Sequence, residues 1–212
     1  MEETPNSELP YSSTLVTNLF AGPGAGKSTT AALVFGLLKS AGLDVELVTE
    51  YAKDKVWEGS GQILANQPYV LGKQLHRLWR LQRKVQVAIT DSPIALSALY
   101  NGEYEHLDAL VLELHQRFNN LNYFIDRVKP YNPNGRGQTE EEARALDRKL
   151  GWLMQKFNVQ ADVKPGNVAG ACRIAEEIYY KIKGKRMHAH ISITFEEDDT
   201  AAIKQQEDKC LC

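Results

Sequence analysis

Residues 21–28 read AGPGAGKS and stand between two apolar stretches, residues 13–20 (STLVTNLF) and residues 28–38. The first stretch predicts a short strand, and the second predicts a helix because its apolar residues recur at helical spacing. The pattern G-x-x-x-x-G-K-[ST] between a strand and a helix is typical of a loop that cradles nucleotide phosphates. Ala21 stands where the pattern has its first glycine, and we expect Gly22 to share that role.

The chemistry of this phosphate loop gives its residues different parts. Glycine lets consecutive backbone N–H groups turn inward around a phosphate, and the positive end of the following helix points at the same place. Lys27 is expected to neutralise the β- and γ-phosphate oxygens, and Ser28 to offer its hydroxyl to Mg²⁺. The expected nucleotide-binding residues are Gly22, Gly24, Ala25, Gly26, Lys27, Ser28 and Thr29. The alternative, a glycine-rich turn that binds nothing, does not account for the strand–loop–helix context.

Strands and helices are expected to alternate along the rest of the chain. Further strands are predicted at 44–49, 85–90, 122–125 and 159–163, and further helices at 69–84, 105–118, 139–157 and 168–182. Such alternation predicts an α/β fold in which helices cover both faces of a five-stranded parallel sheet, the P-loop NTPase three-layer sandwich. We expect the second strand to lie beside the first, and residues 51–68 to be irregular.

Two carboxylates follow strand ends, where ligands of parallel sheets bind. Asp91 can hold Mg²⁺ opposite Ser28, or it can cap a helix that starts near Pro93. Glu50 can orient an acceptor hydroxyl and take its proton, which would make it a catalytic base. The alternative for Glu50 is an ordinary solvated acid, and Asp54 is a weaker candidate for the same role. The predicted metal ligands are therefore Ser28 and Asp91.

Four arginines gather in and after a polar loop, residues 127–138: Arg127, Arg136, Arg144 and Arg148. An arginine-bearing lid can close over a polyphosphate and neutralise its charge. We expect a lid at about residues 127–150, and we place Arg136, Arg144 and Arg148 with Lys27, Glu50 and Asp91 in the catalytic set. The competing interpretation is a helix with surface ion pairs, since acidic residues are interspersed.

A second basic group lies on the predicted helix 69–84 and consists of Lys73, Arg77, Arg80 and Lys84. This face could hold an acceptor phosphate or a strand of DNA, or it could be a solvated helix face. Neighbouring aromatic residues, among them Trp57 and Tyr69, could stack on a base.

Composition sets the frame for these sites. The chain has 212 residues with a formal net charge of −2, which argues against a general polyanion binder. No apolar run reaches membrane-spanning length, no secretory signal pattern is visible, and we expect a cytoplasmic protein. The expected organisation is a flexible start (1–12), a kinase domain (13–195) and a disordered acidic tail (196–212). A homo-oligomer is compatible with the sequence, and the role of the Cys210-Leu211-Cys212 ending stays open.

The order of these motifs resembles the P-loop nucleoside and nucleotide kinases. Residues 50–57 (EYAKDKVW) are similar to the segment after the second strand in deoxynucleoside kinases, where a glutamate serves as base, and to the EY-(G/A)-(R/K)-D stretch of ribosylnicotinamide-kinase-like ATPases, a group with many phage-encoded kinases. The resemblance spans about residues 13–183 and implies a fold like that of the NMP kinases, with a base role for Glu50. Ser92 follows Asp91 where deoxynucleoside kinases carry an arginine, so their sugar-binding roles do not transfer.

The combined expectation is a kinase that uses ATP and Mg²⁺ and phosphorylates a small nucleoside- or nucleotide-like acceptor. A kinase acting on DNA through the basic face is the first alternative, and a non-catalytic nucleotide-binding module is the second. The module would keep Lys27 and Ser28 but would not need Glu50 or the arginines.

Overall fold

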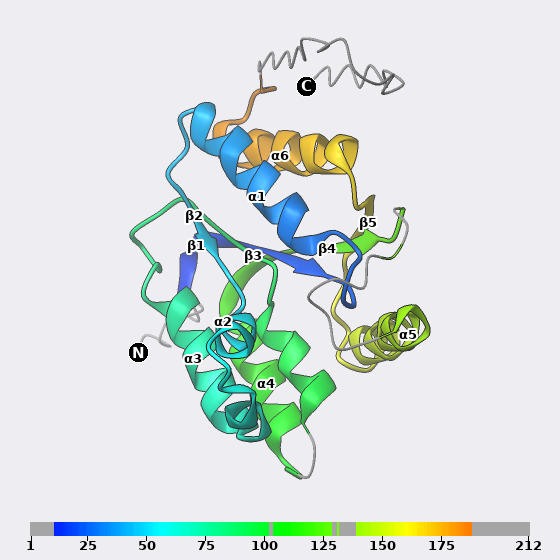
Figure 1. Cartoon of the computed structure of the whole chain (residues 1–212). Helices are drawn as coiled ribbons and strands as arrows, with labels where there is room; N and C mark the ends of the chain where they lie inside the picture. The colour runs from blue at the N-terminus through cyan, green and yellow to red at the C-terminus, as the bar shows by residue number, and fades with distance from the viewer. Residues whose placement is uncertain (1–10, 102–103, 129–130, 132–138, 188–212) are drawn as a thin grey trace, which may run out of the picture.

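The computed structural model of the chain describes residues 11–101, 104–128, 131 and 139–187. Its strands are β1 (Tyr11–Phe20), β2 (Val45–Val48), β3 (Val87–Thr90), β4 (Phe118–Asp126) and β5 (Asp162–Pro165). They form one sheet in the order β2-β3-β1-β4-β5, and every neighbouring pair is parallel (Figure 1). The expected five-stranded parallel sheet is confirmed.

The place of the second strand was predicted wrongly. β3, not β2, is the direct neighbour of β1 on that side, and β2 forms the edge of the sheet. All four residues of β3 are buried, as expected for a central strand with neighbours on both edges. The crossover from β1 to β2 therefore passes over one strand position, which is later filled by β3.

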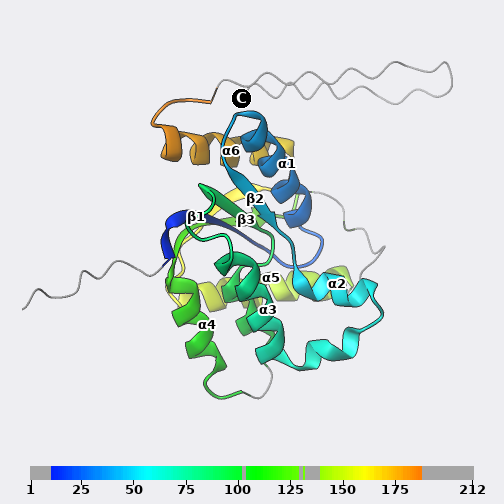
Figure 2. The ribbon, with the colours of Figure 1, turned by 90° about the vertical axis from the view of Figure 1, so that its left-hand side faces the viewer.

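Helices cover both faces of this sheet. They are α1 (Lys27–Ser40), α2 (Tyr51–Trp57), α3 (Gln67–Trp79), α4 (Leu107–Gln116), α5 (Glu140–Lys156) and α6 (Val168–Lys183), with the short 3₁₀ helices η1 (Gly61–Ala65) and η2 (Ile94–Tyr100). α1 and α6 lie together on one face, whereas α3, α4 and α5 lie on the other (Figures 1 and 2). The three-layer arrangement expected from the sequence is thus confirmed.

The side chains of β1 divide between the two helix layers. Leu15 and Leu19 belong to the core under α1 and α6, and Val16 and Phe20 belong to the core under α3, α4 and α5. This division follows from the alternation of side chains along a strand. A central strand buried on both faces ends at the phosphate loop, so the loop starts from a rigid support.

Several element boundaries differ from the prediction. Residues 51–68 are not irregular, because they contain α2 and η1. Burial of Tyr51 fixes the start of α2. Sequence analysis missed this helix because burial against the rest of the fold leaves no pattern in the local sequence. β4 begins well before residue 122. Polar residues such as Asn120 made this part of the strand look like a loop in the sequence. In the structure the Oδ1 atoms of Asn120 and Asn122 accept hydrogen bonds from Asn18 of β1 at 2.8 and 2.9 Å.

Several predictions concern residues that the structure leaves undescribed. Arg136, most of the polar lid loop and the acidic tail 196–212 lie outside the described residues, as do residues 1–10 of the predicted flexible start. Within the described ranges, no helix combines the length and the apolar character that a membrane span requires.

Candidate functional site

The phosphate loop joins β1 to α1 with a backbone that requires glycine. Gly24 and Gly26 have φ angles of 79° and 103°, in the left-handed region where a side chain would be strained. Gly26 occupies the N-cap position of α1, and the helix begins at Lys27. The strand–loop–helix geometry predicted from AGPGAGKS is present, so the positive end of α1 faces the loop.

Lys27 lies folded back along this loop. Its Nζ donates to the carbonyl oxygens of Ala21 and Gly22 at 2.7 and 3.0 Å. Burial lowers the pKa of Lys27 below its ordinary value, and nearby carboxylates act in the opposite direction. These carboxylates belong to Glu50, Asp91 and Asp147. One half-buried ammonium therefore stands among three acids, as expected at a site built for a highly charged ligand.

Ser28 and Asp91 form the predicted pair. The Ser28 hydroxyl donates to Oδ2 of Asp91 at 2.5 Å. Asp91 is only 5% exposed, and its Oδ1 is buried without a hydrogen-bond partner among the described residues. A helix-capping role is not seen, because Pro93 holds the N-cap position of η2. A buried carboxylate oxygen lacking a donor beside a hydroxyl suits a hard divalent cation such as Mg²⁺.

The protein supplies few ligands for such a cation. Within the part of the chain that the structure describes, no group of three or more His, Cys, Asp or Glu side chains could hold a metal. This sparse donor set fits Mg²⁺, which usually takes one or two protein oxygens and completes its shell with water and substrate phosphates.

Glu50 reaches the same site from the end of β2. It occupies the N-cap position of α2, yet its side chain makes no capping hydrogen bond and stays available. Burial raises the pKa of Glu50, and Lys27 partly opposes this effect. Behind it, the buried Gln74 of α3 accepts from the Tyr51 backbone N–H at 3.0 Å and thereby fixes the turn that aims Glu50. Sequence reasoning missed Gln74, although a glutamine among the leucines of α3 was a visible signal.

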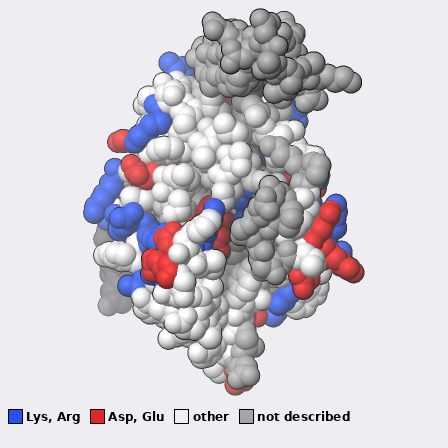
Figure 3. Space-filling model, in the orientation of Figure 1, with Lys and Arg blue, Asp and Glu red and all other residues white. Residues whose placement is uncertain are grey.

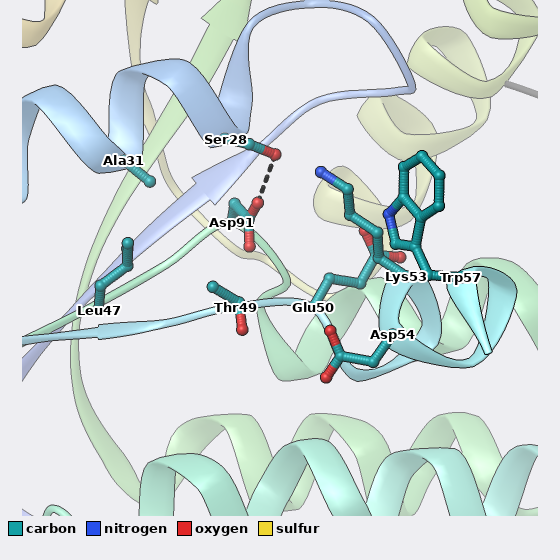
Figure 4. Close-up of a pocket in the computed structure, with 9 residues that line it drawn as sticks. All are labelled: Ser28, Ala31, Leu47, Thr49, Glu50, Lys53, Asp54, Trp57 and Asp91. Atoms are coloured by element: carbon teal, nitrogen blue, oxygen red, sulfur yellow. Dashed lines mark hydrogen bonds between the residues drawn. The ribbon is translucent and has the colours of Figure 1, made fainter. Parts of the chain in front are cut away.

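Ser28, Glu50 and Asp91 line one cavity of about 220 Å³. Figure 4 shows its lining, which comprises Ser28, Ala31, Leu47, Thr49, Glu50, Lys53, Asp54, Trp57 and Asp91. Lys53 and Trp57, one turn apart on α2, extend to the same side of that helix (Figure 4). Sequence reasoning assigned no role to Lys53. Trp57 is 75% exposed, so a flat apolar ring is freely offered at the mouth of the cavity.

Asp54 is a less suitable base than Glu50. Its carboxylate forms an ion pair with Arg77 of α3. Arg77 also donates to the backbone oxygen of Thr49 at 3.0 Å, so the pair ties α2 and α3 to the end of β2. The Asp54 carboxylate is therefore engaged by a guanidinium and is less free than Glu50 to contact an acceptor hydroxyl.

α5 braces the phosphate loop from the other side. Asp147 accepts from the Gly22 backbone N–H at 2.5 Å and from Arg127 at 2.9 Å. Arg127 also donates to the Pro23 carbonyl at 2.8 Å, and its side chain is only 4% exposed. Its Nε and Nη1 atoms are buried without partners among the described residues. The sequence placed Arg127 in the arginine group, but it gave neither Arg127 nor Asp147 a place in the site.

Two of the arginines that were predicted as catalytic, Arg144 and Arg148, are exposed on α5. Arg144 forms an i, i+4 ion pair with Glu140 on the exposed side of α5, and Arg148 is exposed one turn further on. The structure does not bring either side chain into contact with the phosphate loop among the interactions of the described residues. A catalytic part for Arg144, Arg148 and Arg136 stays a prediction.

Comparison with known proteins gives a fold but no family. Neither a protein-family model nor a curated protein matches the chain. Among solved structures, the NadR protein in complex with NR aligns with a TM-score of 0.63 and 14% identity over 85% of this chain and 54% of that chain. This chain therefore spans about half the length of that protein.

Two kinases align less closely. Shikimate kinase from Acinetobacter baumannii in complex with shikimate gives a TM-score of 0.44 at 15% identity, covering 81% of this chain and 93% of that one. The APS kinase of Mycobacterium tuberculosis gives 0.37 at 21% identity, covering 68% and 98%. Because both TM-scores are below 0.5, these two similarities support no conclusion about this chain. The chain has a P-loop NTPase fold. At such identities the likeness establishes the fold alone, and the expected fold class is confirmed.

Proposed function

We propose that the chain is a kinase that moves the γ-phosphate of ATP onto a hydroxyl or phosphate group of a small nucleoside- or nucleotide-like acceptor. The observation that carries this proposal is the shared cavity. Glu50 lines the same space as the Ser28–Asp91 pair, so an acceptor group beside Glu50 lies next to the place where the γ-phosphate would be held. A protein that only bound nucleotide would not need this carboxylate.

On the nucleotide side, the phosphate loop and Lys27 hold the β- and γ-phosphates. Ser28 and Asp91 would hold Mg²⁺, which when bound neutralises phosphate oxygens as their charge shifts. Arg127 adds a positive charge beside Pro23 and Gly24, with two nitrogens that have no hydrogen-bond partner among the described residues. These fixed charges favour departure of the ADP oxygen.

On the acceptor side, Glu50 orients the hydroxyl and takes its proton. The acceptor oxygen forms a bond to the γ-phosphorus while the bond from that phosphorus to the bridging oxygen of ADP breaks. Trp57 offers a stacking surface for a planar base. Lys53, which lines the cavity beside Glu50, can neutralise charge on the group in transit.

The test compares Glu50→Gln with Asp54→Asn. Glu50→Gln should lower the acceptor-dependent transfer rate by about 10²–10⁴-fold, the usual contribution of a general base, with little change in nucleotide affinity. Asp54→Asn is the matched control, because that carboxylate lines the cavity but is paired with Arg77. Transfer rate, ATP affinity and melting temperature are measured for both. If Glu50→Gln transfers phosphate as fast as the wild type, the base assignment is wrong.

A kinase that acts on DNA is the second candidate. It is favoured by three exposed basic residues on and after α3, namely Lys73, Arg80 and Lys84. Transfer only to DNA, with a steep loss of rate on adding salt, would favour it over the small acceptor. ATP binding without any acceptor-stimulated turnover would instead favour a nucleotide-binding module.

A further inference from the structure

A second cavity of about 370 Å³ adjoins the acceptor cavity. It lies beside β2, which is the edge strand of the sheet. Leu47, Thr49 and Asp54 line both cavities, so the two cavities meet at these three residues. Apart from Val48 of β2, the remaining wall is basic and comes from the end of α3 and its C-cap residue, with His76, Arg77 and Arg80.

The charges in this second cavity do not cancel. Arg77 is engaged by Asp54 and by Thr49, whose hydroxyl and backbone oxygen accept from it at 3.1 and 3.0 Å. Arg77 therefore neutralises the one acid of the lining. Arg80 is exposed and forms no ion pair with an acid of the described residues, so its positive charge remains. Figure 3 shows basic side chains gathered on the left edge of the molecule, where this part of α3 lies.

The two cavities differ in chemistry in a way that suits one ligand with two ends. The first offers a half-buried carboxylate, Glu50, and an exposed aromatic ring, Trp57. The second offers guanidinium groups, which match the geometry of phosphate oxygens. Thr49 lies directly before Glu50 in the chain and lines both spaces, so the two ends would be a few ångströms apart across one residue.

We infer that the second cavity binds a phosphate group that the acceptor already carries, and that Arg80 is its principal contact. The inference rests on the proposed function, because it assigns the acceptor hydroxyl to Glu50. The acceptor class is then a phosphorylated nucleoside-like molecule rather than a bare nucleoside. A nucleoside monophosphate and a phosphodiester of DNA offer the same chemistry, and the experiment separates these two sources.

The experiment measures equilibrium binding without turnover. The wild-type chain, Arg80→Ala and Lys84→Ala are titrated with nucleosides, with the matching 5′-monophosphates and with a short oligonucleotide. Lys84→Ala is the matched control, since Lys84 is basic and exposed four residues further along the chain but does not line the cavity. At least one monophosphate should bind about tenfold more tightly than its nucleoside. Arg80→Ala should remove that difference and leave nucleoside affinity and melting temperature unchanged, and Lys84→Ala should change neither.

Other results would overturn the inference. Equal affinity for a nucleoside and its monophosphate would show that no phosphate is recognised. Equal losses in Arg80→Ala and Lys84→Ala would show a diffuse basic face instead of a built cavity. Oligonucleotide binding that depends on Arg80 alone would uphold the cavity and identify a polynucleotide as the source. Since binding is measured apart from transfer, a chain that selects monophosphates but transfers nothing would refute the proposed function and leave the cavity standing.

Discussion

At the scale of single residues, the site consists of buried charges that the fold cannot satisfy by itself. Among the described residues, Asp91 keeps one buried oxygen without a donor and Arg127 keeps two buried nitrogens without acceptors. Buried polar atoms without partners cost free energy, so their persistence here indicates groups reserved for a charged ligand. Four residues of the site were recognisable in the sequence because they belong to the phosphate-loop motif, as Lys27 and Ser28 do, or follow a strand end, as Glu50 and Asp91 do.

The first residue-scale prediction concerns Asp91. Asp91→Asn should lower the transfer rate by about 100-fold or more, because a neutral amide holds a divalent cation poorly. Its melting temperature should stay equal or rise, since a buried charge is removed. The rate is measured across a Mg²⁺ titration, in which the variant should need far more metal. A variant that simply unfolds would show that Asp91 acts mainly in the architecture of the loop.

At the scale of elements, the sequence predicted which segments form helices and strands better than it predicted the positions of these segments in the fold. Apolar runs and phosphate-loop chemistry identified β1, α1 and β3. α5 begins, as predicted, directly after Thr139, which forms a capping box with Glu142. The order β2-β3-β1 was not predictable, because strand partners depend on a crossover that leaves no local pattern. The position of Asp147 against Gly22 was missed for the same reason: only tertiary packing brings α5 to the loop.

The brace between α5 and the phosphate loop can be tested through Asp147. Asp147→Ala should weaken ATP binding by about tenfold, because Gly22 and Arg127 both lose their acceptor. Gln155→Ala is the control, an exposed position near the other end of α5. ATP affinity is measured by titration, together with the melting temperature. An unchanged affinity in a folded Asp147→Ala protein would mean that the loop holds its shape without the brace.

α4 provides a prediction about stability and pH. His115 near its end is 4% exposed and packs edge-on against Phe20 at 6.2 Å. Burial lowers the pKa of His115 to about 4. The unfolded chain binds a proton near the ordinary histidine pKa of about 6.5, so below that pH it holds more protons than the folded chain. Stability should therefore fall as pH drops from about 6.5 to about 4, by roughly 1 kcal/mol per pH unit.

The check is a series of denaturant titrations between pH 4 and pH 7. His115→Gln should show a weaker dependence of unfolding free energy on pH over this window, although it costs some packing at every pH. If both proteins lose stability in parallel as the pH falls, His115 is not the group responsible.

At the scale of the whole molecule, the parallel sheet collects its chemistry at one edge. β1, β2 and β3 end at Phe20, Val48 and Thr90, and each is followed within two residues by a part of the site. The insertion of β3 between β1 and β2 places Asp91 centrally, with the phosphate loop on one side and Glu50 on the other. In the proposed function, this arrangement would align the nucleotide with its acceptor, which is the geometry that phosphoryl transfer needs.

The most direct measurement follows the γ-phosphate itself. ATP labelled at its γ-phosphate is incubated with the chain, Mg²⁺ and, in turn, nucleosides, nucleoside monophosphates, ribosylnicotinamide, and single- and double-stranded DNA. The account predicts that label appears on a small nucleoside- or nucleotide-like acceptor, and that transfer is lost in EDTA, in Lys27→Ala and in Glu50→Gln. Label released only as inorganic phosphate, at the same rate with every acceptor and in Glu50→Gln, would contradict it.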